Sequence, residues 1–99
     1  MAKSTPTKSL SHVLEDQESK ALILKRLKRA NGQLGAVIRM LEEDRPCNDI
    51  VTQMGAASKA INIAALNLIS ASMQECVAED KANGAEVKAQ LEKLLLIFA

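Results

Sequence analysis

Residues 18–43 read ESKALILKRLKRANGQLGAVIRMLEE, and the spacing of the apolar residues in this stretch decides the fold. These residues recur at alternating steps of four and three, which is the period of one face of a helix. The first apolar seam consists of Ile23, Leu27, Ala30, Leu34, Val37 and Leu41. Because the same spacing is the heptad repeat of helices that lie side by side, we expect this helix to pack along another one.

Two more helices are expected after the first. The segment Glu43-Asp44-Arg45-Pro46 breaks the pattern, and Pro46 suits the first turn of a new helix, where its missing N–H is not needed. Residues 46–78 repeat the steps of four and three, and residues 85–98 form a third amphipathic stretch after the Asn83-Gly84 turn signal. The second apolar seam consists of Ile50, Met54, Ala57, Ile61, Ala64 and Leu68.

No part of the chain alternates with the period of two that marks a strand, so we expect an all-α, three-helix protomer. Residues 18–99 are expected to form the helical domain. Residues 1–17 are polar and are expected to form a flexible tail with a short helical turn near Val13 and Leu14.

The length and composition predict a single domain that associates with further copies of itself. The chain has 99 residues and one aromatic residue, Phe98, so a lone protomer buries little apolar area. Neither a signal peptide nor an apolar stretch of membrane-spanning length is visible. We therefore expect a cytoplasmic protein with no membrane partner, in which both cysteines are reduced.

Cys47 and Cys76 lie near the two ends of the expected second helix, 29 residues apart. An intact helix holds them about 43 Å apart, whereas a disulfide needs Cα atoms within roughly 7 Å. Two copies of this helix packed antiparallel about a two-fold axis bring Cys47 of one chain beside Cys76 of the other, twice over. We therefore predict two identical thiol pairs between the subunits of a dimer.

The two thiols are expected to play different parts. A helix N-terminus and a nearby cation such as Arg45 both favour the nucleophilic thiolate, so Cys47 is expected to react first. Cys76 is then the resolving thiol. The alternative is that both cysteines are inert apolar residues of a structural bundle.

A metal site is the competing chemistry for these thiols. Two thiolates and an imidazole would bind a soft metal ion well, but the only histidine, His12, lies in the tail. Ser72, one turn before Cys76 on the same face, is a poor ligand for such an ion. Two-coordinate binding of copper(I) by the thiolates stays open, whereas no resident metal and no cofactor are predicted.

Basic residues gather in one part of the chain. Five of them lie between Lys20 and Arg29 without an acidic residue, which suits a protein that touches an anion with one region. The alternative is an ordinary solvated helix face. These five residues are Lys20, Lys25, Arg26, Lys28 and Arg29.

Residues 25–34, KRLKRANGQL, followed by residues 43–53, EDRPCNDIVTQ, resemble the CsoR/RcnR family of bacterial repressors, and the similarity covers roughly residues 20–98. Copper-sensing members carry Cys, His and Cys where this chain has Cys47, Ser72 and Cys76. Because the histidine is missing, the chain looks most like the CstR-like branch, which senses persulfides. The family usually has a basic residue at the position of Ser58, and Lys59 is displaced from it by one residue.

The resemblance implies an antiparallel four-helix dimer, two of which form a homotetramer, and DNA binding through basic helix faces without a helix-turn-helix. The expected function is therefore a repressor of double-stranded operator DNA. The residues predicted to contact DNA are Lys25, Arg26, Lys28, Arg29, Gln33, Arg39 and Lys59. A persulfide or polysulfide would join Cys47 and Cys76 of neighbouring subunits by a disulfide or longer sulfur bridge and release the operator. The alternative signal is copper(I). An enzyme is not expected, because no acid–base partner accompanies either thiol.

Overall fold

The computed structural model describes residues 12–79 and 84–98, and it consists of three helices with no strand in these residues. Helix α1 spans Gln17–Glu42, α2 spans Cys47–Glu79 and α3 spans Gly84–Phe98. The all-α, three-helix prediction is confirmed, and no helix end differs from the expected one by more than one residue. None of the described helices is long and apolar enough to cross a membrane.

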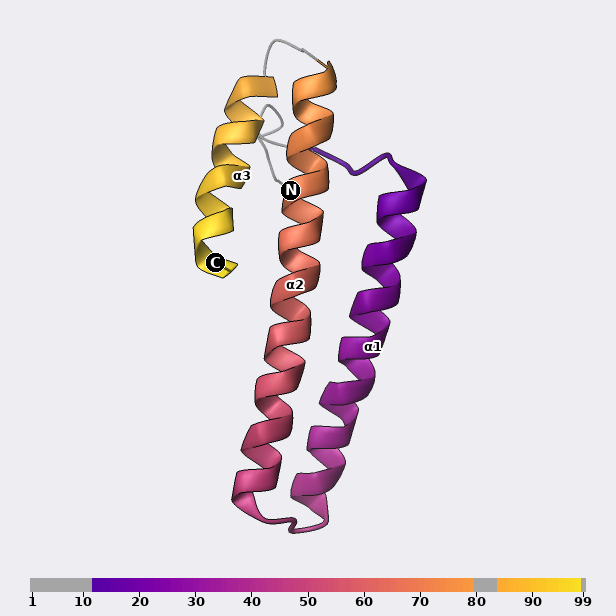
Figure 1. Ribbon diagram of the computed structural model, residues 1–99, viewed down its shortest axis with the longest axis vertical. Coiled ribbons are helices and arrows are strands. Elements are labelled where there is room, and N and C mark those ends of the chain that lie inside the picture. Colours follow the sequence, from indigo (N-terminus) through magenta and orange to yellow (C-terminus); the bar gives the residue numbers. More distant parts are fainter. Residues whose placement is uncertain (1–11, 80–83, 99) are drawn as a thin grey trace, which may run out of the picture.

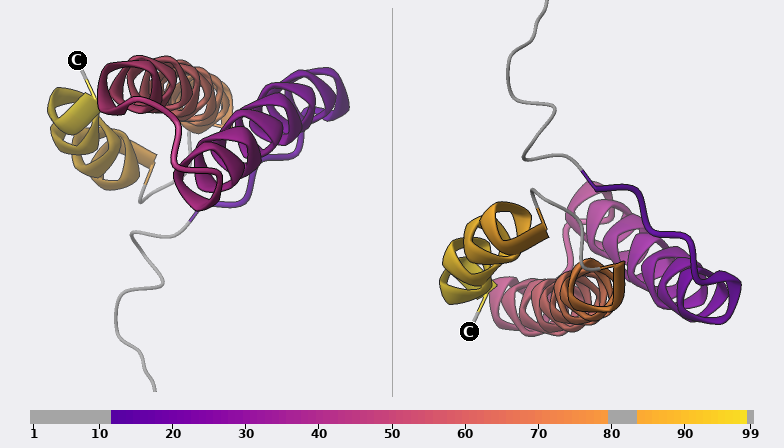
Figure 2. Two further views of the ribbon diagram at one scale, coloured as in Figure 1. Left: turned by 90° about the horizontal axis from the view of Figure 1, so that it is seen from below. Right: turned by 90° about the horizontal axis from the view of Figure 1, so that it is seen from above.

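The long helices α1 and α2 form an antiparallel hairpin, and α3 folds back along the C-terminal part of α2 (Figure 1). Views along the hairpin place α1 and α3 on different sides of α2 (Figure 2). Helix α2 contacts both other helices, whereas α1 and α3 do not contact each other over their described lengths. Helix α2 is therefore the central helix of the protomer, against which α1 and α3 pack separately.

Alternate members of each apolar seam are buried. On α1 the buried members are Ile23, Ala30 and Val37, and the exposed ones are Leu27, Leu34 and Leu41. On α2 the buried members are Ile50, Ala57 and Ala64, and the exposed ones are Met54, Ile61 and Leu68. Burial at every seventh residue shows that one half of each heptad seam closes the α1–α2 hairpin.

The exposed halves of the seams face the same side of the hairpin. Leu34 from α1 and Met54 and Ile61 from α2 line one groove of about 220 Å³. An apolar stripe of this kind is costly to leave in water. Packing of a second copy on this stripe remains a prediction.

The turn between α1 and α2 has the geometry of a Schellman cap. The N–H of Asp44 donates to the carbonyl oxygen of Leu41 at 3.2 Å, and the N–H of Arg45 donates to that of Met40 at 3.0 Å. Asp44 has φ 57°, the left-handed conformation that this cap requires and that Asp adopts more readily than most residues. The chain thus reverses at Asp44, and Cys47 becomes the first residue of α2.

The segment before α1 differs from the prediction. Residues 12–16 are not helical and include no turn at Val13 and Leu14. The physical reason is that the backbone N–H groups of Glu15 and Asp16 bond to the side chain of Glu75 on α2. The remainder of the expected tail, residues 1–11, lies outside the described residues.

Asp16 ends this segment and caps α1. Its carboxylate accepts a hydrogen bond of 2.9 Å from the backbone N–H of Ser19, the usual role of aspartate at a helix N-cap. Hydrogen bonds from Ser19, from its side chain first and its backbone second, hold the pKa of Asp16 below its ordinary value.

Candidate functional site

The two cysteines lie at opposite ends of one unbroken helix. Cys47 is the first residue of α2 and is exposed, whereas Cys76 lies near its other end and is only 4% exposed. The helix between them holds their Cα atoms about 43 Å apart, so the two thiols of one chain cannot meet. Their pairing across two subunits remains a prediction.

Cys47 lies in the first turn of α2. Just before it, the carbonyl oxygen of Pro46 accepts hydrogen bonds from the N–H groups of Asp49 at 3.0 Å and Ile50 at 3.2 Å. Pro46 therefore immediately precedes α2, within one residue of the helix start expected from the sequence. The exposed thiol at the start of α2 is open to reagents from solvent.

Cys76 lies in a tightly packed part of the protomer. Ser72, one turn earlier on α2, is also buried, with 6% of its surface exposed. The carbonyl oxygen of Cys76 lies against the first residue of α3, because a Cβ built on Gly84 would be 3.0 Å from it. A ligand or a second thiol that engages Cys76 therefore has to shift its surroundings.

The described residues contain no group of three or more histidine, cysteine, aspartate or glutamate side chains that could hold a metal ion. A buried hydroxyl at Ser72 adds no nitrogen donor beside Cys76. Cys76 is therefore not part of a cluster of three or more such side chains within the described residues of one protomer.

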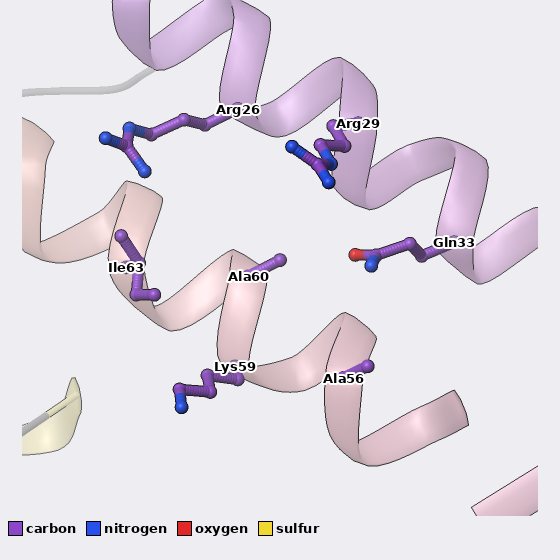
Figure 3. Close-up of a pocket in the computed structure, with 7 residues that line it drawn as sticks. All are labelled: Arg26, Arg29, Gln33, Ala56, Lys59, Ala60 and Ile63. Atoms are coloured by element: carbon purple, nitrogen blue, oxygen red, sulfur yellow. The ribbon is translucent and has the colours of Figure 1, made fainter. Parts of the chain in front are cut away.

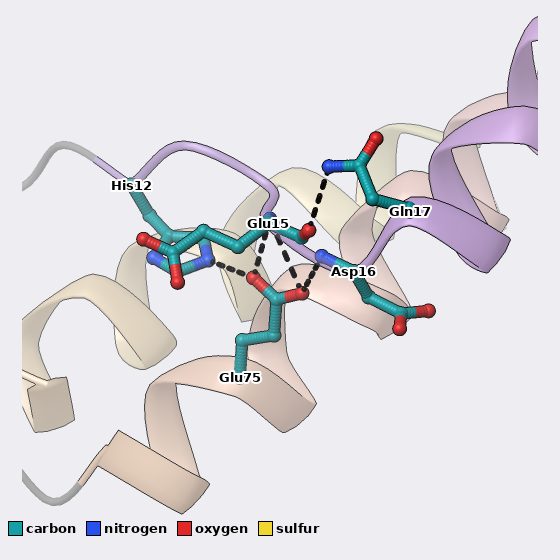
Figure 4. Close-up of polar contacts among 5 residues, drawn as sticks. All are labelled: His12, Glu15, Asp16, Gln17 and Glu75. Carbon is teal, nitrogen blue, oxygen red and sulfur yellow. Dashed lines mark hydrogen bonds and ion pairs between the residues drawn. The ribbon is translucent and has the colours of Figure 1, made fainter.

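A polar cluster that spacing did not predict lies immediately before Cys76 (Figure 4). The Glu75 carboxylate accepts hydrogen bonds from the backbone N–H of Asp16 at 2.7 Å and of Glu15 at 3.0 Å. The His12 Nε2 lies 2.8 Å from the same carboxylate, and its side chain is only 9% exposed. The histidine assigned to a flexible tail is therefore packed against α2.

The donors around Glu75 stabilise its charged form. The backbone N–H of Glu15 contributes most to holding the pKa of the Glu75 carboxyl below its ordinary value, and Asp16 and His12 add to the effect. Burial opposes them. No local pattern in the sequence signals this cluster, because 59 to 63 residues separate Glu75 from its partners.

Four of the residues predicted to contact DNA line a single groove between α1 and α2, with a volume of about 290 Å³. Arg26, Arg29 and Gln33 reach from α1 towards α2 (Figure 3). Lys59 lines the groove from α2, although in Figure 3 its side chain extends away from α1. The other lining residues are Ala56, Ala60 and Ile63.

This basic groove concentrates positive charge because three of its seven lining residues are cationic and none is acidic. The Gln33 Oε1 is buried and lacks a hydrogen-bond partner among the described residues, so it provides a spare acceptor. Lys25, Lys28 and Arg39 are exposed but do not line the groove. The one-residue displacement of Lys59 therefore still places it among the lining residues.

Comparison with known proteins gives consistent matches. Residues 19–98 match the family model described as metal-sensitive transcriptional repressor. The chain is 42% identical over 60 residues to the copper-sensing transcriptional repressor RicR of Mycobacterium tuberculosis, covering 61% of this chain and 62% of that protein, less than two thirds of its length. It is 35% identical over 98 residues to the copper-sensing transcriptional repressor CsoR of Bacillus subtilis, covering 99% of this chain and 94% of that protein.

No solved structure matches the chain. Both relatives are copper-sensing by name, so the expected closeness to the persulfide-sensing branch is not supported by them. That expectation depended on one position, Ser72.

Proposed function

Because the chain belongs to the family of metal-sensitive transcriptional repressors, we propose that it binds operator DNA through the basic groove and releases it when copper(I) binds. Copper(I) would bridge Cys47 of one subunit and Cys76 of its partner. The observation that carries this proposal is the placement of an exposed and a buried thiol at opposite ends of α2. Such placement prevents a link within one chain, so a ligand that joins the two thiols has to join two subunits.

The basic groove supports the DNA-binding half of the proposal. Arg26 and Arg29 can each donate to phosphate oxygens, and no acidic residue in the lining opposes an anion. The Gln33 amide nitrogen can donate to phosphate, whereas its buried Oε1 can accept only from a donor such as a base amino group. Lys25, Lys28, Arg39 and Lys59 would add phosphate contacts around the groove.

The sensing half of the proposal requires assembly into a dimer, and we propose that two dimers then form a tetramer. The exposed seam halves of α1 and α2 lie on one side of the hairpin, where an antiparallel copy can cover them. Antiparallel packing aligns the start of one α2 with the end of the other. Each dimer would then hold two thiol pairs, and the tetramer would present the basic groove four times.

The chemistry of the thiols fits copper(I), the signal for which the two relatives are named. Soft thiolates are preferred ligands of copper(I), and binding releases the thiol protons. The exposed Cys47 can take the ion from solvent, and the buried Cys76 can complete a site with little access to water. The buried Ser72 leaves this site with two strong donors.

A persulfide is the second candidate signal, and Ser72 favours it because this buried residue, one turn before Cys76 on α2, supplies a hydroxyl and not a nitrogen ligand. The Cys47 thiolate would take the outer sulfur of a persulfide RSSH and expel the thiolate RS⁻. Cys76 of the partner subunit would then attack the inner sulfur, expel HS⁻ and leave a disulfide.

The decisive experiment measures binding of the reduced protein to the DNA duplex that it selects from a random pool. Fluorescence anisotropy is recorded without additive, with copper(I) under anaerobic conditions, and with inorganic polysulfide. We expect copper(I) to weaken binding in the wild type and to have no effect on Cys47→Ser or Cys76→Ser. If polysulfide releases the DNA and copper(I) does not, and non-reducing mass spectra show covalent dimers, the signal is a persulfide and not copper(I). Unchanged binding under both treatments would contradict the proposed function.

A further inference from the structure

We infer that Glu75 is a positioning residue that couples the state of the Cys76 thiol to the DNA-binding helix α1. The inference depends on the proposed function, because it specifies how engagement of Cys76 reaches the basic groove. It is carried by the contacts of one carboxylate on α2 with the segment that leads into α1.

Glu75 holds the start of α1 in place through main-chain contacts. The backbone N–H groups of Glu15 and Asp16 lie 3.0 and 2.7 Å from its carboxylate oxygens, and the His12 Nε2 lies 2.8 Å away (Figure 4). Asp16 is the N-cap of α1. Because the bonds from residues 15 and 16 involve the backbone, moving Glu75 moves the chain at the origin of α1 and not merely a side chain.

Glu75 is also joined directly to the sensing thiol. It precedes Cys76 in the same turn of α2, and Cys76 is buried against its own protomer. Engagement of Cys76 by a ligand shared with another subunit has to shift or rotate this turn. A displacement of about 1 Å is enough to lose hydrogen bonds of this kind, since they weaken steeply with distance and angle.

Movement of α1 relative to α2 changes the shape of the basic groove, because both helices line it. Its guanidinium groups, on Arg26 and Arg29, lie on α1, whereas Lys59 and the apolar lining lie on α2. Arg26 is ten residues, or about 15 Å, from the N-cap, so a tilt at the cap is transmitted along a rigid helix. Release of the segment from Glu75 therefore alters the spacing of the cations that face the DNA.

The test measures, for the wild type and three variants, the DNA affinity of the signal-free protein divided by that of the copper(I)-loaded protein. We expect this ratio to lie within the roughly 5- to 150-fold range common for allosteric coupling in the wild type, and to fall below about 3 in Glu75→Ala. Glu75→Gln keeps one carbonyl acceptor and should fall between them. Glu86→Ala removes an exposed carboxylate from α3, which does not contact α1, so it is the matched control and should retain the wild-type ratio.

Copper(I) affinity measured without DNA should stay within about threefold of wild type in Glu75→Gln and Glu75→Ala, since neither change removes a thiol. Circular dichroism establishes that each variant is folded, and Glu75→Gln serves as the decisive variant if Glu75→Ala is not. A wild-type ratio retained by the folded Glu75 variant overturns the inference and leaves the proposed function intact.

Hydrogen exchange separates failure of the inference from failure of the proposed function. Copper(I) should accelerate exchange of the Glu15 and Asp16 amides in the wild type and leave it unchanged in Cys76→Ser. Accelerated exchange without DNA release would support the coupling to α1 and contradict the repressor mechanism. Release without any change at these amides would contradict the coupling alone.

Discussion

The carbonyl oxygen of Cys76 lies so close to Gly84 that a Cβ added to this glycine would be 3.0 Å away from it. The obstacle is backbone, which cannot rotate aside as a side chain does. We therefore expect Gly84→Ala to lower the free energy of unfolding by about 1 kcal/mol, although alanine favours helix formation. Chemical denaturation at a fixed protein concentration measures this change.

Gly32→Ala is the matched control for that substitution. A Cβ at Gly32 meets no heavy atom within 4 Å, and the residue lies inside α1. Alanine there should raise the unfolding free energy by about 0.5–1 kcal/mol. If both alanine variants are stabilised equally, the close approach of α3 to Cys76 does not constrain the protomer.

The apolar pattern predicted the three helices because each seam runs for several turns without a competing period. It could not divide a seam into its two halves, since Ile23 and Leu27 are equally apolar but only Ile23 faces α2. Four of the seven residues predicted to contact DNA line one groove because α1 and α2 pack side by side. The cluster at Glu75 was not predictable, because contact with His12 depends on tertiary packing across 63 residues.

Low pH should weaken the cap of α1 through Asp16. Its pKa is depressed in the folded chain by hydrogen bonds from Ser19, so its contribution is present above the unfolded pKa of about 4 and is lost as pH falls through the folded value. Asp16→Asn keeps a capping side chain without this titration. The thermal midpoint of the wild type should exceed that of Asp16→Asn by more at pH 7 than at pH 3, and an equal difference at both pH values contradicts the assignment.

Removal of a cation from the basic groove should weaken DNA binding in a salt-dependent way. Arg26→Ala and Arg29→Ala each remove a guanidinium that lines the groove. The slope of log K against log salt concentration should become less steep by about 0.9 for every phosphate that the variant no longer neutralises. Lys93→Ala, at an exposed position on α3, is the control and should leave the slope unchanged. Equal effects of the three variants would show that DNA does not bind at the groove.

A charge placed in the exposed half of the α1 seam should prevent assembly. Leu34 is 45% exposed in the protomer and lines the same groove as Met54 and Ile61. If a second copy covers this stripe, Leu34→Glu buries an unpaired carboxylate at a cost of about 3–5 kcal/mol, which weakens the dimer by roughly two to four orders of magnitude. Sedimentation velocity should show a monomer for Leu34→Glu and the wild-type oligomer for Val13→Glu, at a residue that is 78% exposed before α1. A Leu34→Glu protein that sediments like the wild type would place the subunit interface elsewhere, and the pairing of Cys47 with Cys76 between antiparallel α2 helices would lose its structural basis.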